Sequence, residues 1–165
     1  MTSAPTLTAA AGYEVVVLEG CDGTGKTTLA TALAVRHGYT VLHFGRTPGR
    51  VDLAERYRSV LSCPGRFVLD RSFISELVYG PLRYGRSRLS VTAAAELALQ
   101  VADRRGVLIH LTGRPDEIAA RLRARDGYAP TPEQVADVIN AYRDVFDALA
   151  GTAPIITVDV TAETA

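Results

Sequence analysis

The sequence has few of the features that mark secreted or membrane proteins. Two cysteines in 165 residues are too few for a disulfide framework, which fits a reducing compartment. No apolar run approaches the roughly 18 residues that a membrane helix needs, and residues 1–12 lack the basic start of a signal peptide. We therefore expect a cytoplasmic protein without a membrane partner, in which residues 1–12 form a flexible N-terminal arm.

Lysine is nearly absent. Lys26 is the only lysine among 18 basic residues, and 18 acidic residues bring the formal net charge to zero. A neutral chain is not a general trap for polyanions, although arginine suits two-point recognition of phosphate groups. A GC-rich genome also produces an arginine-rich protein, so the composition alone does not assign a function.

Short apolar, β-branched runs alternate with segments of helical pattern. The pattern predicts strands at 14–19, 39–44, 66–70, 106–111 and 154–160. It predicts helices at 27–37, 51–61, 73–79, 90–105, 115–125 and 132–149, with Pro81 ending the third of them. Such alternation indicates an α/β fold in one domain over residues 13–165, with a parallel sheet and helices on both of its faces.

Residues 20–27 carry the most specific motif. They match the pattern G-x-x-x-x-G-K-[ST] at every fixed position, between an expected strand and an expected helix. In such a loop, backbone N–H groups and a helix N-terminus surround phosphate, the lysine reaches the β- and γ-phosphates, and the threonine hydroxyl binds Mg²⁺. The motif predicts a three-layer P-loop NTPase fold with a five-stranded parallel sheet, and ATP and Mg²⁺ as cofactors. The residues expected to hold ATP here are Gly20, Asp22, Gly23, Thr24, Gly25, Lys26, Thr27 and Thr28.

Four segments resemble, in order, those of thymidylate kinases and related enzymes. Residues 19–28 resemble the opening E-G-x-D-G-x-G-K-T-T, residues 46–49 the R-E-P-G segment, and residues 70–79 the D-R-Y-x-x-S-x-x-A-Y segment. Residues 121–125 resemble the R-x-x-x-R lid helix of nucleoside and nucleotide kinases. The resemblance spans about residues 14–146. It implies a thymidylate kinase-like enzyme that phosphorylates a (deoxy)nucleoside monophosphate such as dTMP or a modified analogue, in a family where homodimers are common.

Three positions depart from that family. Gly80 stands where the family has a glutamine that contacts the base, Ser72 replaces the tyrosine of D-R-Y, and Thr47 replaces the glutamate of R-E-P-G. These departures leave the acceptor open. The alternative is a kinase for a modified nucleoside, a nucleic-acid hydroxyl or a small alcohol. A further alternative is a nucleotide-binding regulator with slow hydrolysis.

A basic segment follows the third motif. Residues 78–88 look similar to short phage and actinobacterial relatives, and they hold Arg83, Arg86 and Arg88 with Tyr84 between them. Arginines interleaved with an aromatic residue suit additional phosphates or a nucleic-acid backbone. This leaves nucleic acid open as a partner, while a solvated loop is the plainer interpretation.

The resemblance assigns catalytic roles near the transferring phosphate. It implies that Asp22 contacts the acceptor, that Arg71 binds phosphate at the reaction centre, and that Arg46 binds the acceptor's phosphate. The alternatives are an ordinary turn residue for Asp22 and exposed surface arginines for the other two.

Polar residues within or at the end of apolar strands form a separate group. Asp70 ends an expected strand at its carboxyl end, where doubly wound sheets bind ligands, so it is expected to hold Mg²⁺ or orient the acceptor. Its alternative is the N-cap of the next helix. His43 and His110 lie within apolar runs and are expected to be core residues without metal-ligand spacing.

Two pairs of residues stand four apart, which places each pair on one helix face. Ser75 and Tyr79 are expected to line the acceptor pocket, although packing in the core is an equal alternative for the tyrosine. In the resembling kinases, the residue that matches Arg121 stacks on adenine and the one that matches Arg125 reaches the transferring phosphates. Guanidinium groups suit both roles.

Overall fold

The computed structural model describes residues 4–128 and 130–162, and over these residues it contains a five-stranded parallel sheet. The strands are Val15–Glu19 (β1), Thr40–His43 (β2), Phe67–Asp70 (β3), Gly106–Thr112 (β4) and Ile155–Asp159 (β5), in the order β2-β3-β1-β4-β5.

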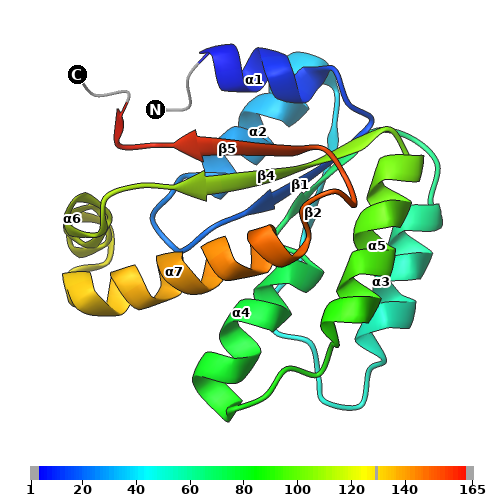
Figure 1. The fold of residues 1–165 in the computed structure, drawn as a ribbon. Helices are drawn as coiled ribbons and strands as arrows, with labels where there is room; N and C mark the ends of the chain where they lie inside the picture. Colours follow the sequence, from blue (N-terminus) through cyan, green and yellow to red (C-terminus); the bar gives the residue numbers. More distant parts are fainter. Residues whose placement is uncertain (1–3, 129, 163–165) are drawn as a thin grey trace.

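Helices cover both faces of this sheet (Figure 1). One face is covered by α1 (Ala4–Ala11) and α2 (Lys26–His37). The other is covered by α3 (Leu53–Ser62), α4 (Phe73–Tyr84), α5 (Val91–Asp103) and α7 (Pro132–Ala148). Helix α6 (Pro115–Asp126) lies beyond the carboxyl ends of the strands. The predicted three-layer α/β fold is confirmed.

Strand β1 is the centre of the core. Val15 and Val17 point into the larger apolar cluster, toward α3, α4, α5 and α7, while Val16 and Leu18 point into the smaller cluster, toward α1 and α2. Successive side chains of a strand alternate between its faces, so a strand covered on both sides is apolar throughout. The continuous valine run therefore encodes a central strand.

The register brings polar residues together at one edge of the sheet. Asp70 on β3 is paired with Leu18 on β1 and with His43 on β2, and Glu19 on β1 is paired with His110 on β4. Parallel strands end at the same edge, so polar groups that are distant in sequence meet there.

The predicted flexible arm is instead a helix over residues 4–11. Leu7 and Ala10 are buried in the cluster that contains α2. The Tyr39 hydroxyl donates to the carbonyl oxygen of Ala10 (3.2 Å), and Arg66 donates to that of Ala11 (2.7 Å). Both donors come from distant parts of the chain and bind the helix C-terminus, where carbonyl groups have no partner within the helix. Residues 1–3 of the predicted arm lie outside the described residues.

The prediction that Pro81 ends its helix is also wrong, because α4 continues to Tyr84. Proline cannot donate a backbone hydrogen bond, but its fixed φ is compatible with a helix. Gly85 ends the helix with a left-handed φ of 71°, and its N–H donates to the carbonyl oxygen of Pro81 (3.0 Å). Arg83 therefore lies in the last turn of α4 rather than in a loop.

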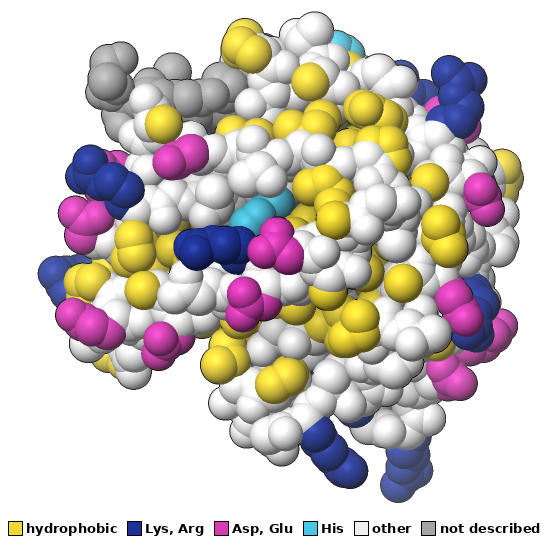
Figure 2. Space-filling view, in the orientation of Figure 1, with side chains coloured by type: hydrophobic (Ala, Val, Ile, Leu, Met, Phe, Trp, Pro, Cys, Tyr) yellow, Lys and Arg dark blue, Asp and Glu magenta, His cyan; other side chains and the backbone are white. Residues whose placement is uncertain are grey.

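The charged side chains are unevenly distributed over the surface, although the formal net charge is zero. Figure 2 shows acidic and basic side chains together along the left and right sides of one face, while basic ones project from its lower end, below the loops that lead into α3 and α5 in Figure 1. Across the described ranges, none of the helices combines the length and apolar character needed to cross a membrane.

His110 is a core residue, as predicted. It is 5% exposed, and its ring stacks on Phe146 of α7 with centroids 4.4 Å apart. Burial, with a smaller effect from Arg143, lowers the pKa of His110 to about 4 from the ordinary value of 6.5. The unfolded chain therefore binds a proton between these two pH values that the folded chain does not.

We expect this histidine to make the protein acid-sensitive. The free energy of unfolding should fall by about 2 kcal/mol from this group as the pH drops from 7 to about 4.5. His110→Phe keeps a stacked ring and removes the titration, so it should lose less stability over the same range. Urea denaturation at both pH values measures the difference. Equal losses in the two proteins would contradict the assignment.

Candidate active site

The phosphate loop forms a tight turn between β1 and α2. Gly20 has a φ of 148°, and a Cβ atom there would lie 2.2 Å from the carbonyl oxygen of Leu111. Only glycine fits so close to a neighbouring backbone. Behind the loop, the Thr24 hydroxyl donates to the carbonyl oxygen of Cys21 (2.8 Å). The predicted loop is thus formed between the strand and the helix that the sequence indicates.

Lys26 is the first residue of α2 and is 6% exposed. Its ammonium group donates to the carbonyl oxygens of Gly20 (2.7 Å) and Cys21 (2.8 Å), inside the curve of the loop. Burial and the nearby Arg71 lower the pKa of Lys26, while Glu19 opposes this effect. The cation is therefore held at the loop by oxygen atoms.

A cavity of about 400 Å³ opens in front of the loop. Its lining contains nine of the predicted site residues together with three residues from the end of β2 and the segment after it. They are Asp22, Gly23, Gly25, Lys26, Thr27, Thr28, Asp70, Arg71 and Arg125, with His43, Phe44 and Gly45. We call this the donor cavity. Gly20 and Thr24 belong to the loop but not to this lining.

Two oxygen ligands suited to Mg²⁺ touch each other in the donor cavity. The Thr27 hydroxyl donates to the Asp70 carboxylate (Oγ1 to Oδ2, 2.7 Å). Mg²⁺ prefers hard oxygen ligands and commonly binds one or two protein groups plus phosphate oxygens. The residues therefore fit this ion. Within the described part of the chain, no group of three or more His, Cys, Asp or Glu side chains forms a metal cage, so phosphates and water would complete the coordination.

His43 departs from its prediction as a core residue. Its side chain is 62% exposed, because β2 is an edge strand and His43 is the last residue of that strand. Its Nδ1 atom lies 3.0 Å from Oδ2 of Asp70, the oxygen that also accepts from Thr27. The alternative of Asp70 as a helix N-cap is wrong, because Ser72 caps α4 by accepting from the Ile74 N–H.

Glu19 organises the site and was not among the predicted site residues. It is fully buried, and burial raises the pKa of its carboxyl group, while the Ser72 and Ser75 hydroxyls act in the opposite direction. Its Oε1 atom accepts from the Ser72 N–H (2.6 Å), the Ser72 hydroxyl (2.8 Å) and the Ser75 N–H (3.1 Å). Its Oε2 atom accepts from the Ser75 hydroxyl (2.8 Å) and the Tyr142 hydroxyl (3.1 Å). A single carboxylate thus joins β1 to α4 and α7. A charged residue at the end of an apolar strand was the available sequence signal.

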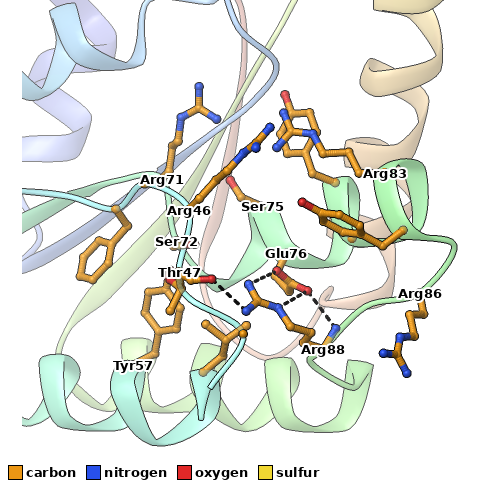
Figure 3. Close-up of a pocket in the computed structure, with 17 residues that line it drawn as sticks. Arg46, Thr47, Tyr57, Arg71, Ser72, Ser75, Glu76, Arg83, Arg86 and Arg88 are labelled. Atoms are coloured by element: carbon orange, nitrogen blue, oxygen red, sulfur yellow. Dashed lines mark hydrogen bonds and ion pairs between the residues drawn. The ribbon is translucent and has the colours of Figure 1, made fainter. Parts of the chain in front are cut away.

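A second cavity, of about 420 Å³, lies beside the first (Figure 3). Its lining is rich in arginine and aromatic residues: Phe44, Gly45, Arg46, Thr47, Gly49, Leu53, Tyr57, Arg71, Ser72, Ser75, Glu76, Tyr79, Gly80, Arg83, Tyr84, Arg86 and Arg88. We call this the acceptor cavity, after the role that the sequence analysis predicts for three of its residues. Arg46, Ser75 and Tyr79 are among these lining residues, and their contact with an acceptor stays a prediction. Tyr79 also packs on Tyr142 with ring centroids 6.1 Å apart, so its side chain both lines the cavity and contacts the core.

The two cavities share one wall, formed by Phe44, Gly45 and Arg71. Arg71 follows β3 with a left-handed φ of 72°, and its N–H donates to the carbonyl oxygen of Leu18 (3.2 Å). Its guanidinium group bonds to the Asp22 carboxylate. A strained backbone for a residue other than glycine is common at functional sites. The turn after β3 therefore places the guanidinium group of Arg71 between the two cavities.

The two arginines that match the lid helix of the resembling kinases differ in their contacts. Arg125 lines the donor cavity, and its guanidinium group makes two hydrogen bonds of 2.6 Å to the Asp126 carboxylate. Arg121 is not among the residues that line the donor cavity, and it donates to the carbonyl oxygen of Val160 (3.0 Å). Its predicted stacking on adenine stays a prediction.

Gly80, a departure from the resembling family, has a structural reason. A Cβ atom there would lie 2.9 Å from both the Arg86 carbonyl oxygen and the Ser87 Cα atom, so glycine lets the segment after α4 pack against the helix. Arg88 then bonds to both oxygens of the Glu76 carboxylate and donates to the carbonyl oxygen of Thr47 (2.9 Å). One wall of the acceptor cavity is held by these contacts.

The fold is similar to that of several solved structures. The YorR protein from Bacillus subtilis, solved with phosphorylated GDP, has a TM-score of 0.77 at 22% identity, over 88% of this chain and 85% of that chain. A deoxyadenosine kinase from M. mycoides with bound dCTP has a TM-score of 0.57 at 14% identity, over 88% and 90%. A shikimate kinase from Acinetobacter baumannii has a TM-score of 0.51 at 20% identity, over 93% and 87%.

The chain has a P-loop kinase-like fold. This likeness is one of structure, because no family model and no curated protein matches the sequence. In this fold, the donor cavity lies at the carboxyl edge of the sheet, at the start of α2.

We expect the Glu19 network to carry much of the stability of the site. Glu19→Ala leaves the N–H and hydroxyl of Ser72 and the N–H of Ser75 without their acceptor, which should lower the free energy of unfolding by about 3 kcal/mol. Glu19→Gln keeps one oxygen acceptor and should cost less. Chemical denaturation of both variants measures this, and an alanine variant as stable as the wild type would contradict it.

Proposed function

We propose that the protein is a kinase that transfers the γ-phosphoryl group of ATP to a (deoxy)nucleoside monophosphate. The observation that carries this proposal is the shared wall of the two cavities. A phosphate loop opens into one cavity, an arginine-rich lining surrounds the other, and Arg71 belongs to both. Two phosphate-bearing molecules bound in these cavities would meet at one guanidinium group.

The donor side has the groups that phosphoryl transfer requires. Backbone N–H groups of the loop and the N-terminus of α2 would hold the β-phosphate. Lys26 and Arg125 would offset charge on the migrating group, and Thr27 and Asp70 would hold Mg²⁺. The ion would neutralise charge on the phosphate groups.

The acceptor side favours a phosphate over a hydroxyl group. Among the described residues that line the acceptor cavity, Glu76 is the only carboxylate, and Arg88 occupies both of its oxygens. In the donor cavity, Asp22 bonds to Arg71, and Asp70 bonds to Thr27. A hydroxyl acceptor benefits from a general base, whereas a phosphate oxygen is already ionised at neutral pH.

The reaction would be an in-line displacement at the γ-phosphorus atom. An oxygen of the acceptor's phosphate forms the new bond as the bond to the β-phosphate oxygen breaks, which yields ADP and a nucleoside diphosphate. Positioning and charge stabilisation supply most of the rate in such reactions. Arg71 would bind both phosphates, with its orientation maintained by Asp22.

The base of the acceptor is proposed from the resemblance. The segments similar to those of thymidylate kinases support dTMP or a modified analogue as the first acceptor to test. The YorR structure was solved with phosphorylated GDP, which adds guanine nucleotides to the same panel.

Lys26→Ala is the direct test of the donor site. It removes the cation from the phosphate loop and should lower turnover by about a hundredfold or more, since such charges act mainly in the transition state. Lys26→Arg keeps the charge but not the shape and should also be impaired. A coupled ADP assay, with circular dichroism as a check on folding, measures the effect. An unchanged rate would contradict the assignment.

An acceptor panel tests the class of reaction. ADP formation should depend on an added nucleoside monophosphate, and phosphorus NMR should detect the diphosphate product. ADP release without any acceptor would instead favour a regulator with slow hydrolysis. Product formed only from nucleosides, a nucleic-acid hydroxyl or small alcohols would favour the alternative class of kinase.

A further inference from the structure

Arg83 is placed by α4 against an aromatic ring. It stands four residues after Tyr79 on the same helix, and its guanidinium carbon lies 4.6 Å from the centre of the Tyr79 ring. Residues four apart share a helix face, and guanidinium groups stack well on aromatic rings. This contact requires α4 to continue through Pro81, because a helix that ended there would leave Arg83 in a loop.

Three guanidinium groups gather at the top of the acceptor cavity in Figure 3. Arg46 comes from the segment after β2, Arg71 from the turn after β3, and Arg83 from the last turn of α4. The same figure shows the guanidinium group of Arg86 pointing away from this group. Three segments that are distant in sequence therefore direct positive charge to one place.

These three guanidinium groups have few acidic partners. Arg71 bonds to Asp22, but neither Arg46 nor Arg83 makes an ion pair with another described residue. Arg88, in contrast, bonds to Glu76 and to a backbone carbonyl of the opposite loop, so it has a structural role. Like charges that converge in a cavity repel one another, and a bound anion removes that repulsion.

We propose that Arg83, held on the Tyr79 ring, binds the acceptor's phosphate together with Arg46, and that this pair selects a nucleoside monophosphate over the matching nucleoside. The inference rests on the proposed function and deepens it. Stacking limits the motion of the Arg83 side chain before the acceptor binds, which reduces the entropy lost on binding. A neutral nucleoside gains nothing from the two cations, so the charged pair discriminates between the two classes of acceptor.

The test measures the acceptor KM and the ATP KM separately for the full-length protein. The probes are dAMP, dCMP, dGMP and dTMP, each compared with its deoxynucleoside. Arg83→Gln should raise the KM for the preferred monophosphate by about 10- to 100-fold, which is the expected loss of a charge-assisted hydrogen bond. The KM for ATP should stay within about twofold. The preference for monophosphate over nucleoside should fall by the same factor.

Two further variants sharpen the result. Tyr79→Leu removes the ring but keeps the guanidinium group, so it should raise the same KM by a smaller factor than Arg83→Gln. Arg36→Gln removes one exposed positive charge from the last turn of α2, at the end opposite the phosphate loop, and should leave both KM values unchanged. This control separates local binding from a general effect of net charge.

The possible failures are distinguishable. An Arg83→Gln enzyme with a wild-type KM for the monophosphate and an unchanged preference would overturn the inference and leave the proposed function intact. A wild-type protein that transfers phosphate to none of the monophosphates would overturn both. Equal losses in Arg83→Gln and Arg36→Gln would also overturn the role of Arg83, because net charge alone would then explain the effect.

Discussion

The buried carboxylate of Glu19 is the interaction on which the rest of the site depends. It accepts hydrogen bonds from both ends of the segment that begins α4 and from the hydroxyl of Tyr142 on α7. A buried charge without hydrogen-bond partners would destabilise the fold. The hydrogen bonds to Glu19 therefore fix the positions of the donor groups. The phosphate loop follows Glu19 directly, and α4 carries Ser75, Tyr79 and Arg83. One group therefore sets the position of the acceptor cavity relative to the donor cavity.

A second constraint is the common edge at which the parallel strands end. Glu19, His43 and Asp70 all lie there because β1, β2 and β3 run in the same direction. The loop after β1 forms the donor cavity, and segments after β2 and β3 form parts of both cavities. Their contact at Arg71 follows from the strand order, in which β3 lies between β1 and β2.

Local signals allowed accurate prediction where short-range chemistry decides the structure. The strand before the phosphate loop, the loop itself and the start of the helix predicted over residues 90–105 all depend on neighbouring residues. Predictions failed where a distant partner decides. Residues 4–11 are ordered by Tyr39 and Arg66. The error at Pro81 has a local reason, since a proline inside a helix does not necessarily end it, and α4 continues to Tyr84. His43 is exposed because its strand lies at the edge of the sheet, and strand order does not follow from one sequence.

The sequence by itself determined the phosphate loop, the alternation of strands and helices, and the polar residues that end the strands. Each of these features lies within one strand, helix or turn, so residues that are neighbours in the sequence decide it. Only the tertiary structure decided which of the many arginines meet. Arg46, Arg71 and Arg83 gather in one cavity, while Arg88 braces a wall and Arg121 bonds to a backbone carbonyl. The direction of a guanidinium group depends on partners that the fold brings together, and local sequence does not specify those partners.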